Sequence, residues 1–436
     1  MKKHLITLSK FMLMFAMMCL PLVSCGGDDD EPSSDSGSGS GSDTEKPGDW
    51  GDDSGITDDK LYLEQTANEF LNRFRASDQA AVITMANEFV NDYGDLDFPE
   101  KFTDLAPANP ALAMMKNIAT SLSSKTLGIS RAYDNYFYAF GDFTGVYEPG
   151  RYMWNRVADS DAIIFRYTNR SGEPCTIQAV ASGGTWDGSI KIDGDTYKAT
   201  VPKVIDITVT KGSAVMLSAQ INLNYSKNSH LTVDVVTKAA NLEVKETVNA
   251  NNSIVTSNTQ LIVSGSCILT ANANVTGSRL CDQDYIQTLI EQEDGETLCK
   301  MFTQGTATSD VLGRVQVKGS ISNLFDIIEA CDFDGYDYFN SNAENDAKNA
   351  ARVLNNNLKS SFYYNGTSNV RGSLSFQAYI SYISSWNGSI EWGIEPLLVF
   401  KDGTKYSFED YFGEGRFGNV ESSFENIIDT YKALWK

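Results

Sequence analysis

The spacing of hydrophobic residues predicts a group of helices over residues 60–127. Apolar positions recur there every three or four residues, the period of a helix with one buried face. Asn109 and Pro110 are a typical N-cap and first-turn pair for the last helix, and Gly128 suits its C-terminal cap. The three stripes are Leu63, Ala67, Phe70, Leu71 and Phe74; Val82, Met85, Ala86, Phe89, Val90 and Tyr93; and Leu112, Met115, Ile118, Ala119 and Leu122.

From about residue 133 to 278 the hydrophobic period changes to two, which predicts β-strands. In the run 215–225, apolar and polar residues alternate, as in an antiparallel sheet with one packed face. The same alternation places Cys267 and Leu269 on one face and Ile268 on the other. Long strands twist, so we expect a strongly curved sheet. Expected turns between strands include Gly183-Gly184, Lys211-Gly212 and Asn251-Asn252.

After residue 280 helical and strand-like patterns alternate. Helices are expected at 283–293, 343–358 and 420–435, and strands at 371–383 and 389–400. The fold class is therefore expected to be α+β, with N-terminal helices, a long curved antiparallel β-sheet and a mixed α/β C-terminal part.

The first residues have the pattern of a secretory signal peptide. Lys2, Lys3 and Lys10 are basic, and the apolar run that follows is too short to span a bilayer comfortably. The run ends in the sequence LVSC, residues 22–25, which resembles the bacterial lipobox. This resemblance implies cleavage before Cys25, acyl chains such as palmitate on that cysteine, and anchoring in the outer membrane.

An acidic run follows the cysteine directly: Asp28, Asp29, Asp30 and Glu31. It resembles the export signal of Bacteroides-type surface lipoproteins, which implies a location facing the cell exterior. A solvated acidic tether is the plainer interpretation of such a run, and the two are compatible. The stretch 389–412 is also loosely similar to sequences in lipoproteins of this type, a resemblance that implies no catalytic residue.

Composition divides the chain into five expected parts. Residues 32–57 are rich in Ser, Gly and Asp and cannot bury a core, so they are expected to be a disordered tether. The parts are 1–24, the lipoprotein signal peptide; 25–58, the lipidated cysteine and acidic Gly/Ser tether; 59–128, helical; 129–280, antiparallel β-sheet; and 281–436, mixed α/β. The whole of 59–436 is also compatible with one large domain.

The formal net charge of −22 argues against nucleic acid as a partner, because phosphate backbones repel an acidic surface. Anionic lipid headgroups repel it as well, so the membrane contact is expected to run through the lipid at Cys25.

Cysteine and histidine usage excludes several kinds of site. The cysteines after the lipobox have no CxxC spacing, which argues against a zinc site; Cys281 and Cys299 have the spacing to close a loop, but buried free thiols are the default. The chain has two histidines, and only His230 follows the signal peptide. We expect His230 in an exposed turn, and a histidine-based catalytic triad or multi-histidine metal centre is not expected.

Two short motifs are weak. The sequence GEGRFG, residues 413–418, matches a dinucleotide-binding loop, but no second strand follows its helix. Asp332, Asp334 and Asp337 cluster in an oxygen-rich turn and are a weak calcium candidate, although the EF-hand pattern is not met. No cofactor is expected.

Three functions remain open. The first is a surface lipoprotein that binds or scaffolds a glycan or protein without catalysis. Under this hypothesis the protein is not an enzyme. The second is a carrier of an apolar ligand in a cleft of the curved sheet. The third is a glycoside hydrolase with an unidentified carboxylate pair. Trp154, Trp186, Trp386 and Trp392 are candidates for stacking on sugar rings, or are core residues.

Overall fold

The computed structural model describes residues 58–73, 75–94, 96–97, 137–192, 195–292, 294–336, 341–364, 368–385 and 388–407. The chain divides into two compact units. Unit 1 comprises Met1–Ala67 and Thr303–Gly418, and unit 2 comprises Asn68–Phe302 and Asn419–Lys436. The helices expected at 109–127 and 420–435 and the glycine-rich motif at 413–418 lie outside the described residues.

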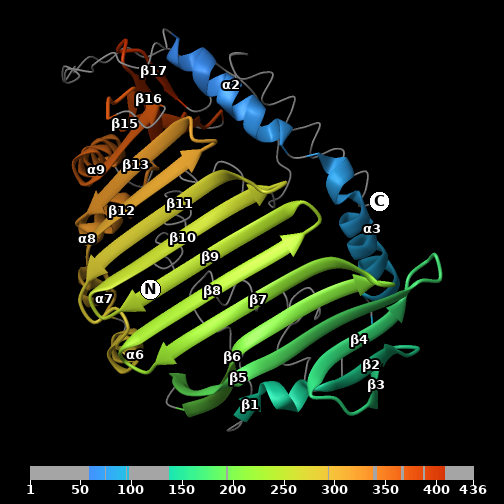
Figure 1. Cartoon of the computed structure of the whole chain (residues 1–436). Coiled ribbons are helices and arrows are strands. Elements are labelled where there is room, and N and C mark those ends of the chain that lie inside the picture. Colours follow the sequence, from blue (N-terminus) through green and yellow to red (C-terminus); the bar gives the residue numbers. More distant parts are fainter. Residues whose placement is uncertain are drawn as a thin grey trace. The chain divides into compact units, whose positions relative to one another are not determined.

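Unit 2 is built on a mostly antiparallel sheet whose strands β4 to β11 follow one another as successive hairpins (Figure 1). Only β1 with β6 and β2 with β4 pair in parallel among its described strands. The strands are β1 (Phe137–Ala139), β2 (Gly145–Pro149), β3 (Trp154–Ala158), β4 (Ala162–Thr168), β5 (Pro174–Ile192), β6 (Asp195–Lys211), β7 (Ala214–Ser226), β8 (His230–Ala239), β9 (Leu242–Asn251), β10 (Ile254–Val263) and β11 (Ser266–Gly277).

Two bulges account for where the sequence expectation and the sheet differ. Gly183 and Gly184, expected as a turn, lie inside β5, where their positive φ angles of 72° and 80° let the strand bend at a register shift. In β11, Leu261 faces Leu269 and Ile262 faces Cys267, so Ile268 is an extra residue. Cys267 is therefore exposed, on the opposite face from Leu269, and the adjacent residues Ile268 and Leu269 are both buried, which simple alternation would not allow.

The core of unit 2 forms where helix α3 (Ala76–Tyr93) packs on the sheet. The predicted stripe is confirmed, since Met85 and Phe89 are buried there. Trp154 at the start of β3 is fully buried, 6.1 Å from the ring of Phe89 and 5.1 Å from that of Phe165. Apolar residues of β4, β5, β6 and β7 complete this core.

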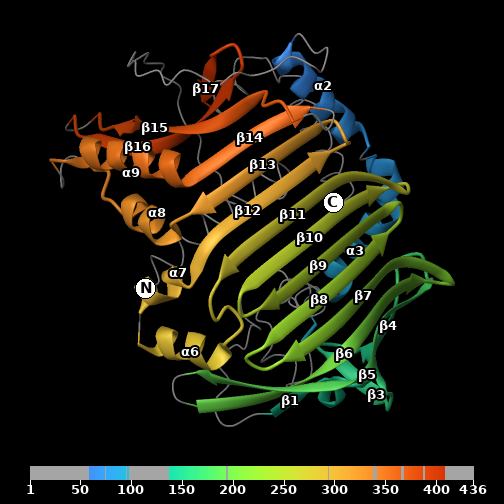
Figure 2. The ribbon, with the colours of Figure 1, turned by 60° about the vertical axis from the view of Figure 1, so that its left-hand side comes forward.

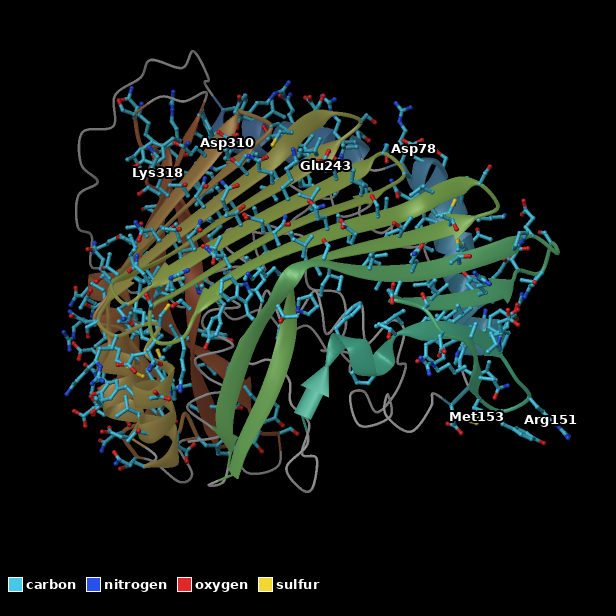
Figure 3. The ribbon with its side chains drawn as sticks, turned by 60° about the horizontal axis from the view of Figure 1, so that its bottom comes forward. Asp78, Arg151, Met153, Glu243, Asp310 and Lys318 are labelled. Atoms are coloured by element: carbon cyan, nitrogen blue, oxygen red, sulfur yellow. The ribbon has the colours of Figure 1, made fainter. Side chains whose placement is uncertain are left out.

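The long strands of unit 2 have one polar and one apolar face, and they curve along their length (Figure 3). On the polar face, side chains bond across strands: the Thr232 hydroxyl donates to Asn249 at 3.0 Å and the Thr247 hydroxyl to Asp234 at 2.7 Å. The apolar face is packed less completely than expected, because Ile221 and Val233 are buried but most of its other residues in β8 to β10 are half-buried. The helices that follow are α6 (Gln283–Glu291), which confirms the predicted helix, and α7 (Gly295–Lys300).

Unit 1 contains an antiparallel meander in which each strand pairs with the next from β12 to β17. Helices α8 (Leu324–Cys331) and α9 (Ala343–Asn357) pack against it, and Ala347 and Ala350 are fully buried, so α9 approaches closely. The predicted helix at 343–358 and the strands at 371–383 and 389–400 are confirmed within one residue at each end. The strands are β12 (Phe302–Val311), β13 (Val315–Ser322), β14 (Leu358–Tyr364), β15 (Gly372–Ile383), β16 (Ile390–Phe400) and β17 (Lys405–Ser407). The structure is mostly β, so the α+β class holds only in outline.

Helix α2 (Asp59–Asn72) begins in unit 1 beside a buried arginine. The Tyr364 hydroxyl donates to the backbone oxygen of Asp59 at 3.1 Å, and the rings of Tyr62 and Tyr364 lie 4.6 Å apart. Burial raises the pKa of the Asp59 carboxyl, and the Arg371 guanidinium opposes this rise. Arg371 is 2% exposed.

Replacing Asp59 with asparagine is expected to stabilise the protein at pH 8. A carboxyl whose pKa is raised in the folded state contributes stability at low pH and loses it as the pH rises through that pKa. We therefore expect Asp59→Asn to raise the unfolding free energy by on the order of 1 kcal/mol at pH 8, and the gain to shrink toward pH 4. Thermal melts across pH measure it. Asp58→Asn is the control, because Asn also caps helices well; a loss of stability at every pH would contradict the expectation.

Candidate functional site

The predicted lipidation and export residues, Cys25 and Asp28 to Glu31, lie outside the described residues and stay predictions. So does Asp337 of the calcium candidate. Asp332 and Asp334 lie in the loop after α8, where the Asp334 carboxylate accepts from the backbone N–H of Tyr336 at 3.1 Å. Among the described residues, no group of three or more His, Cys, Asp or Glu side chains is placed to hold a metal ion.

His230 is the first residue of β8 and is half-buried, rather than lying in an exposed turn. Strand pairing with Ser226 and Asn251 covers it from both sides, and its Nε2 lies 3.4 Å from Asn224 Oδ1. The Asn224 amide can orient the imidazole, but this contact supplies no nucleophile.

The cysteines after the lipobox all carry thiols, and Cys281 and Cys299 form no disulfide. Burial raises the thiol pKa of Cys175 and Cys281, and it raises that of Cys331 to about 11. These three thiols stay protonated near neutral pH and are poor nucleophiles, because the thiolate is the reactive form.

Alkylation is expected to single out Cys267. It is exposed beside the β11 bulge, whereas Cys175 is 1% exposed. Brief iodoacetamide treatment of the native protein at pH 7.5, read by peptide mass spectrometry, should label Cys267 first and Cys175 only after unfolding. Cys267→Ser serves as the control and should remove the fast phase. Equal labelling of Cys267 and Cys175 would show that the bulge is misplaced.

The tryptophans considered for sugar stacking lie in different surroundings. Trp154 is a core residue, which removes it as a surface platform. Trp186 is half-buried, with its indole N–H donating to the Leu223 carbonyl at 2.8 Å and Lys203 4.3 Å above its ring. Trp392 is half-buried opposite Ile380, and Trp386 lies outside the described residues.

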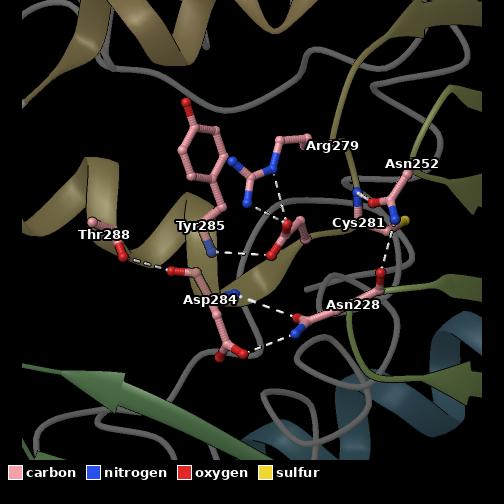
Figure 4. Close-up of polar contacts among 8 residues, drawn as sticks. Asn228, Asn252, Arg279, Cys281, Asp284, Tyr285 and Thr288 are labelled. Carbon is pink, nitrogen blue, oxygen red and sulfur yellow. Dashed lines mark hydrogen bonds and ion pairs between the residues drawn. The ribbon is translucent and has the colours of Figure 1, made fainter.

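A polar cluster at the N-terminus of α6 holds that helix against two hairpin turns (Figure 4). The Asn252 amide donates to the Asn228 carbonyl at 2.8 Å, and the Asn228 amide donates to Asp284 at 2.8 Å. Arg279 lies 3.5 Å from the centre of the Tyr285 ring and donates to Asp282. These groups hydrogen-bond to one another, so the role of the cluster is to fix α6 to the hairpin turns.

Unit 1 has a pocket of about 560 Å³ between α8 and α9. The Arg352 guanidinium there donates to Asn349 Oδ1 at 2.7 Å. Carboxylates and amides dominate the walls, which suits a small polar ligand but indicates no reaction. The lining residues are Asp326, Glu329, Ala330, Phe333, Asp346, Asn349, Arg352, Val353, Asn356 and Asn357.

Among the described residues of unit 1, the largest group of exposed apolar side chains lies at the end of the β15–β16 hairpin, here called the ribbon (residues 377–383 and 390–395). Tyr379, Ile380, Tyr382 and Ile383 are 37%, 43%, 51% and 60% exposed. Helix α9 packs along one side of these strands (Figure 2). The sequence predicted this strand but not its exposed apolar surface. The run AYISYI, residues 378–383, has large apolar residues at both odd and even positions, and a strand with one buried face needs them at only one of the two.

Unit 2 has a smaller exposed apolar group at the β2–β3 connection. Tyr152 and Met153 are 67% and 41% exposed, and Figure 3 shows Arg151 and Met153 at its projecting tip. The Arg151 guanidinium lies 4.9 Å from the centre of the Tyr152 ring, so part of this group is covered by its own chain.

No family model, curated protein or solved structure matches this chain. No described helix has the length and apolar character needed to cross a membrane.

Proposed function

We propose that this protein is a lipid-anchored, outer-membrane lipoprotein facing the cell exterior, and that it binds an extracellular ligand without catalysis through the ribbon of unit 1. The observation that carries the binding role is the exposure of Tyr379, Ile380, Tyr382 and Ile383 within five consecutive positions. Contiguous exposed apolar surface marks interaction sites, since leaving it in water has a free-energy cost.

The lipobox-like sequence LVSC supports the lipid anchor, and the acidic run after Cys25 supports a location facing the cell exterior. Protease treatment of intact cells expressing the full chain tests both. We expect the wild-type protein to be cleaved, and a variant lacking Asp28 to Glu31 to be protected. Cys25→Ala should lose the membrane association. Protection of the wild type on intact cells, with cleavage only after lysis, would place the protein inside and overturn this part.

The binding role is tested on the same cells by placing an aromatic photo-cross-linking amino acid at Tyr379 or Tyr382. We expect a light-dependent adduct of higher mass at these positions. Val157, which is 51% exposed on β3, is the matched control and should give none. Absence of adducts at both ribbon positions on cells that display the protein would contradict the ribbon as a binding surface.

A second candidate function, carriage of an apolar ligand, is favoured by the half-buried apolar face of unit 2. The register places Glu246 of β9 opposite Val235, among apolar neighbours, and burial raises the pKa of its carboxyl. Native mass spectrometry of the protein released gently from membranes should then show a co-purifying lipid-like mass. A single mass equal to that of the acylated chain would argue against carriage.

A further inference from the structure

The two sides of the ribbon differ. Phe376 is buried against α8 and α9, and Ile394 packs in the same cluster, so this side of the strands faces the helices. Gln377 and Tyr379 point the other way, because side chains alternate along a strand. The outer face is therefore defined by Gln377, Tyr379 and Tyr382 of β15 and by their opposite residues Glu395, Gly393 and Glu391 of β16.

A bulge puts both tyrosines on this outer face. Tyr379 and Tyr382 are three residues apart, and in a regular strand they would point to opposite sides. Tyr379 pairs with Gly393 and Tyr382 with Glu391, so Ser381 is an extra residue that restores the common face. Bulges of this kind re-aim side chains next to functional sites.

Gly393 makes room for the first tyrosine ring. A Cβ built on Gly393 would lie 2.9 Å from Tyr379 Cε1 and 3.4 Å from the Ser381 Cβ. The ring thus lies across the neighbouring strand. Any larger residue at this position would push it away. The absence of a side chain at 393 and the bulge at Ser381 act together to present an aromatic surface.

Hydrogen-bonding groups border the tyrosines. The Gln377 amide donates to the Glu395 carboxylate at 2.5 Å, which fixes both side chains beside Tyr379. Glu391 stands opposite Tyr382, and its backbone oxygen accepts from the Ser381 hydroxyl at 3.0 Å. Carboxylates accept hydrogen bonds and the amide and phenol groups both donate and accept, which matches a ligand rich in hydroxyl groups.

From this arrangement we propose that the outer face binds a chain of neutral sugar residues, which stack on Tyr379 and Tyr382 and bond to Gln377, Glu391 and Glu395. This inference rests on the proposed function and names its ligand class. A pyranose ring presents an apolar C–H face and hydroxyls at its edge, as this surface requires. Two local carboxylates and the net charge of −22 disfavour acidic polysaccharides.

Affinity electrophoresis of the full chain in gels containing single polysaccharides tests the proposal. The probes are neutral glucans, mannans, xylans and galactans, with alginate and pectate as acidic comparisons. We expect at least one neutral polymer, and neither acidic one, to retard the wild type. Tyr379→Ala and Tyr382→Ala should each weaken binding by about tenfold or more, the loss expected when an aromatic anchor is truncated.

Two further variants separate stacking from folding. Gly393→Ala keeps both tyrosines but displaces the Tyr379 ring, so it should weaken binding with an unchanged melting temperature. Tyr152→Ala removes a tyrosine of unit 2 that is more exposed than Tyr379 or Tyr382, and this variant should bind like the wild type. Unretarded migration of the wild type in every neutral polymer, or full binding by the Tyr379→Ala, Tyr382→Ala double variant, would overturn the sugar assignment. A protein adduct in the cross-linking experiment together with no polysaccharide binding would leave the ribbon a binding surface but make sugar the wrong class; failure of both would remove the proposed function.

Discussion

Replacing Trp154 with alanine will lower the free energy of unfolding by about 3–5 kcal/mol, the usual cost of truncating a fully buried large aromatic residue. Trp154 is 0% exposed, and it packs against the rings of Phe89, Tyr93 and Phe165. The change removes contacts with both α3 and β4 and leaves a cavity that the surrounding strands cannot fill.

Urea denaturation followed by circular dichroism measures this effect, and hydrogen exchange locates it. We expect amide exchange in α3 to accelerate more than exchange in α9, which lies in the other unit. Val157→Ala on the same strand is the control and should stay within about 0.5 kcal/mol of the wild type, because Val157 is exposed. A change of similar size in both variants would mean that β3 does not pack as described.

Replacing Arg371 with methionine is expected to have the second large effect. Arg371 is 2% exposed and lies 5.7 Å from the centre of the Tyr364 ring. Its positive charge also counters the effect of burial on Asp59. Truncating this buried side chain removes its packing against Tyr364 and leaves the burial of the Asp59 carboxylate unopposed by the guanidinium, so we expect a loss of about 3 kcal/mol in the free energy of unfolding.

The pH dependence identifies the cause of the Arg371 effect. Without the guanidinium, the pKa of Asp59 rises further, so the loss of stability should be largest at pH 8 and smaller at pH 5. Combining Arg371→Met with Asp59→Asn should recover part of the loss, which measures the coupling of the two side chains. An equal loss at both pH values with no recovery would show that Arg371 acts through packing of its stem.

The described residues include polar surfaces that bond within their own chain and an apolar surface that is exposed. The polar face of unit 2 and the cluster around Asn252 bond internally. The ribbon exposes large apolar side chains that its own helices do not cover. A ligand class for the ribbon therefore follows from side-chain chemistry, since no similarity to a known protein supplies one.

The sequence by itself predicted several of the helices and strands, although α7, α8 and β12 to β14 were not among them. Helices α3 and α9 follow from stripes such as Met85 and Phe89, and β15 and β16 from runs that the predicted ranges matched within one residue. The turns at Lys211-Gly212 and Asn251-Asn252 were also predicted correctly. These features depend on neighbours three or four residues away or on turn conformations, and local sequence contains that information.

Only the tertiary structure decided how the elements face one another. The bulges at Ile268 and Ser381 reverse the parity of every residue beyond them, and a bulge exists only relative to the register of a partner strand. For this reason Cys267 is exposed, and Tyr379 and Tyr382 share a face. Likewise, the sequence left open whether Trp154 is a core or a surface residue, and the structure buries it. Arg371 acts on the carboxyl of Asp59 although the two residues are far apart in the sequence. Burial and charge pairing are set by contacts between distant segments, which no local pattern specifies.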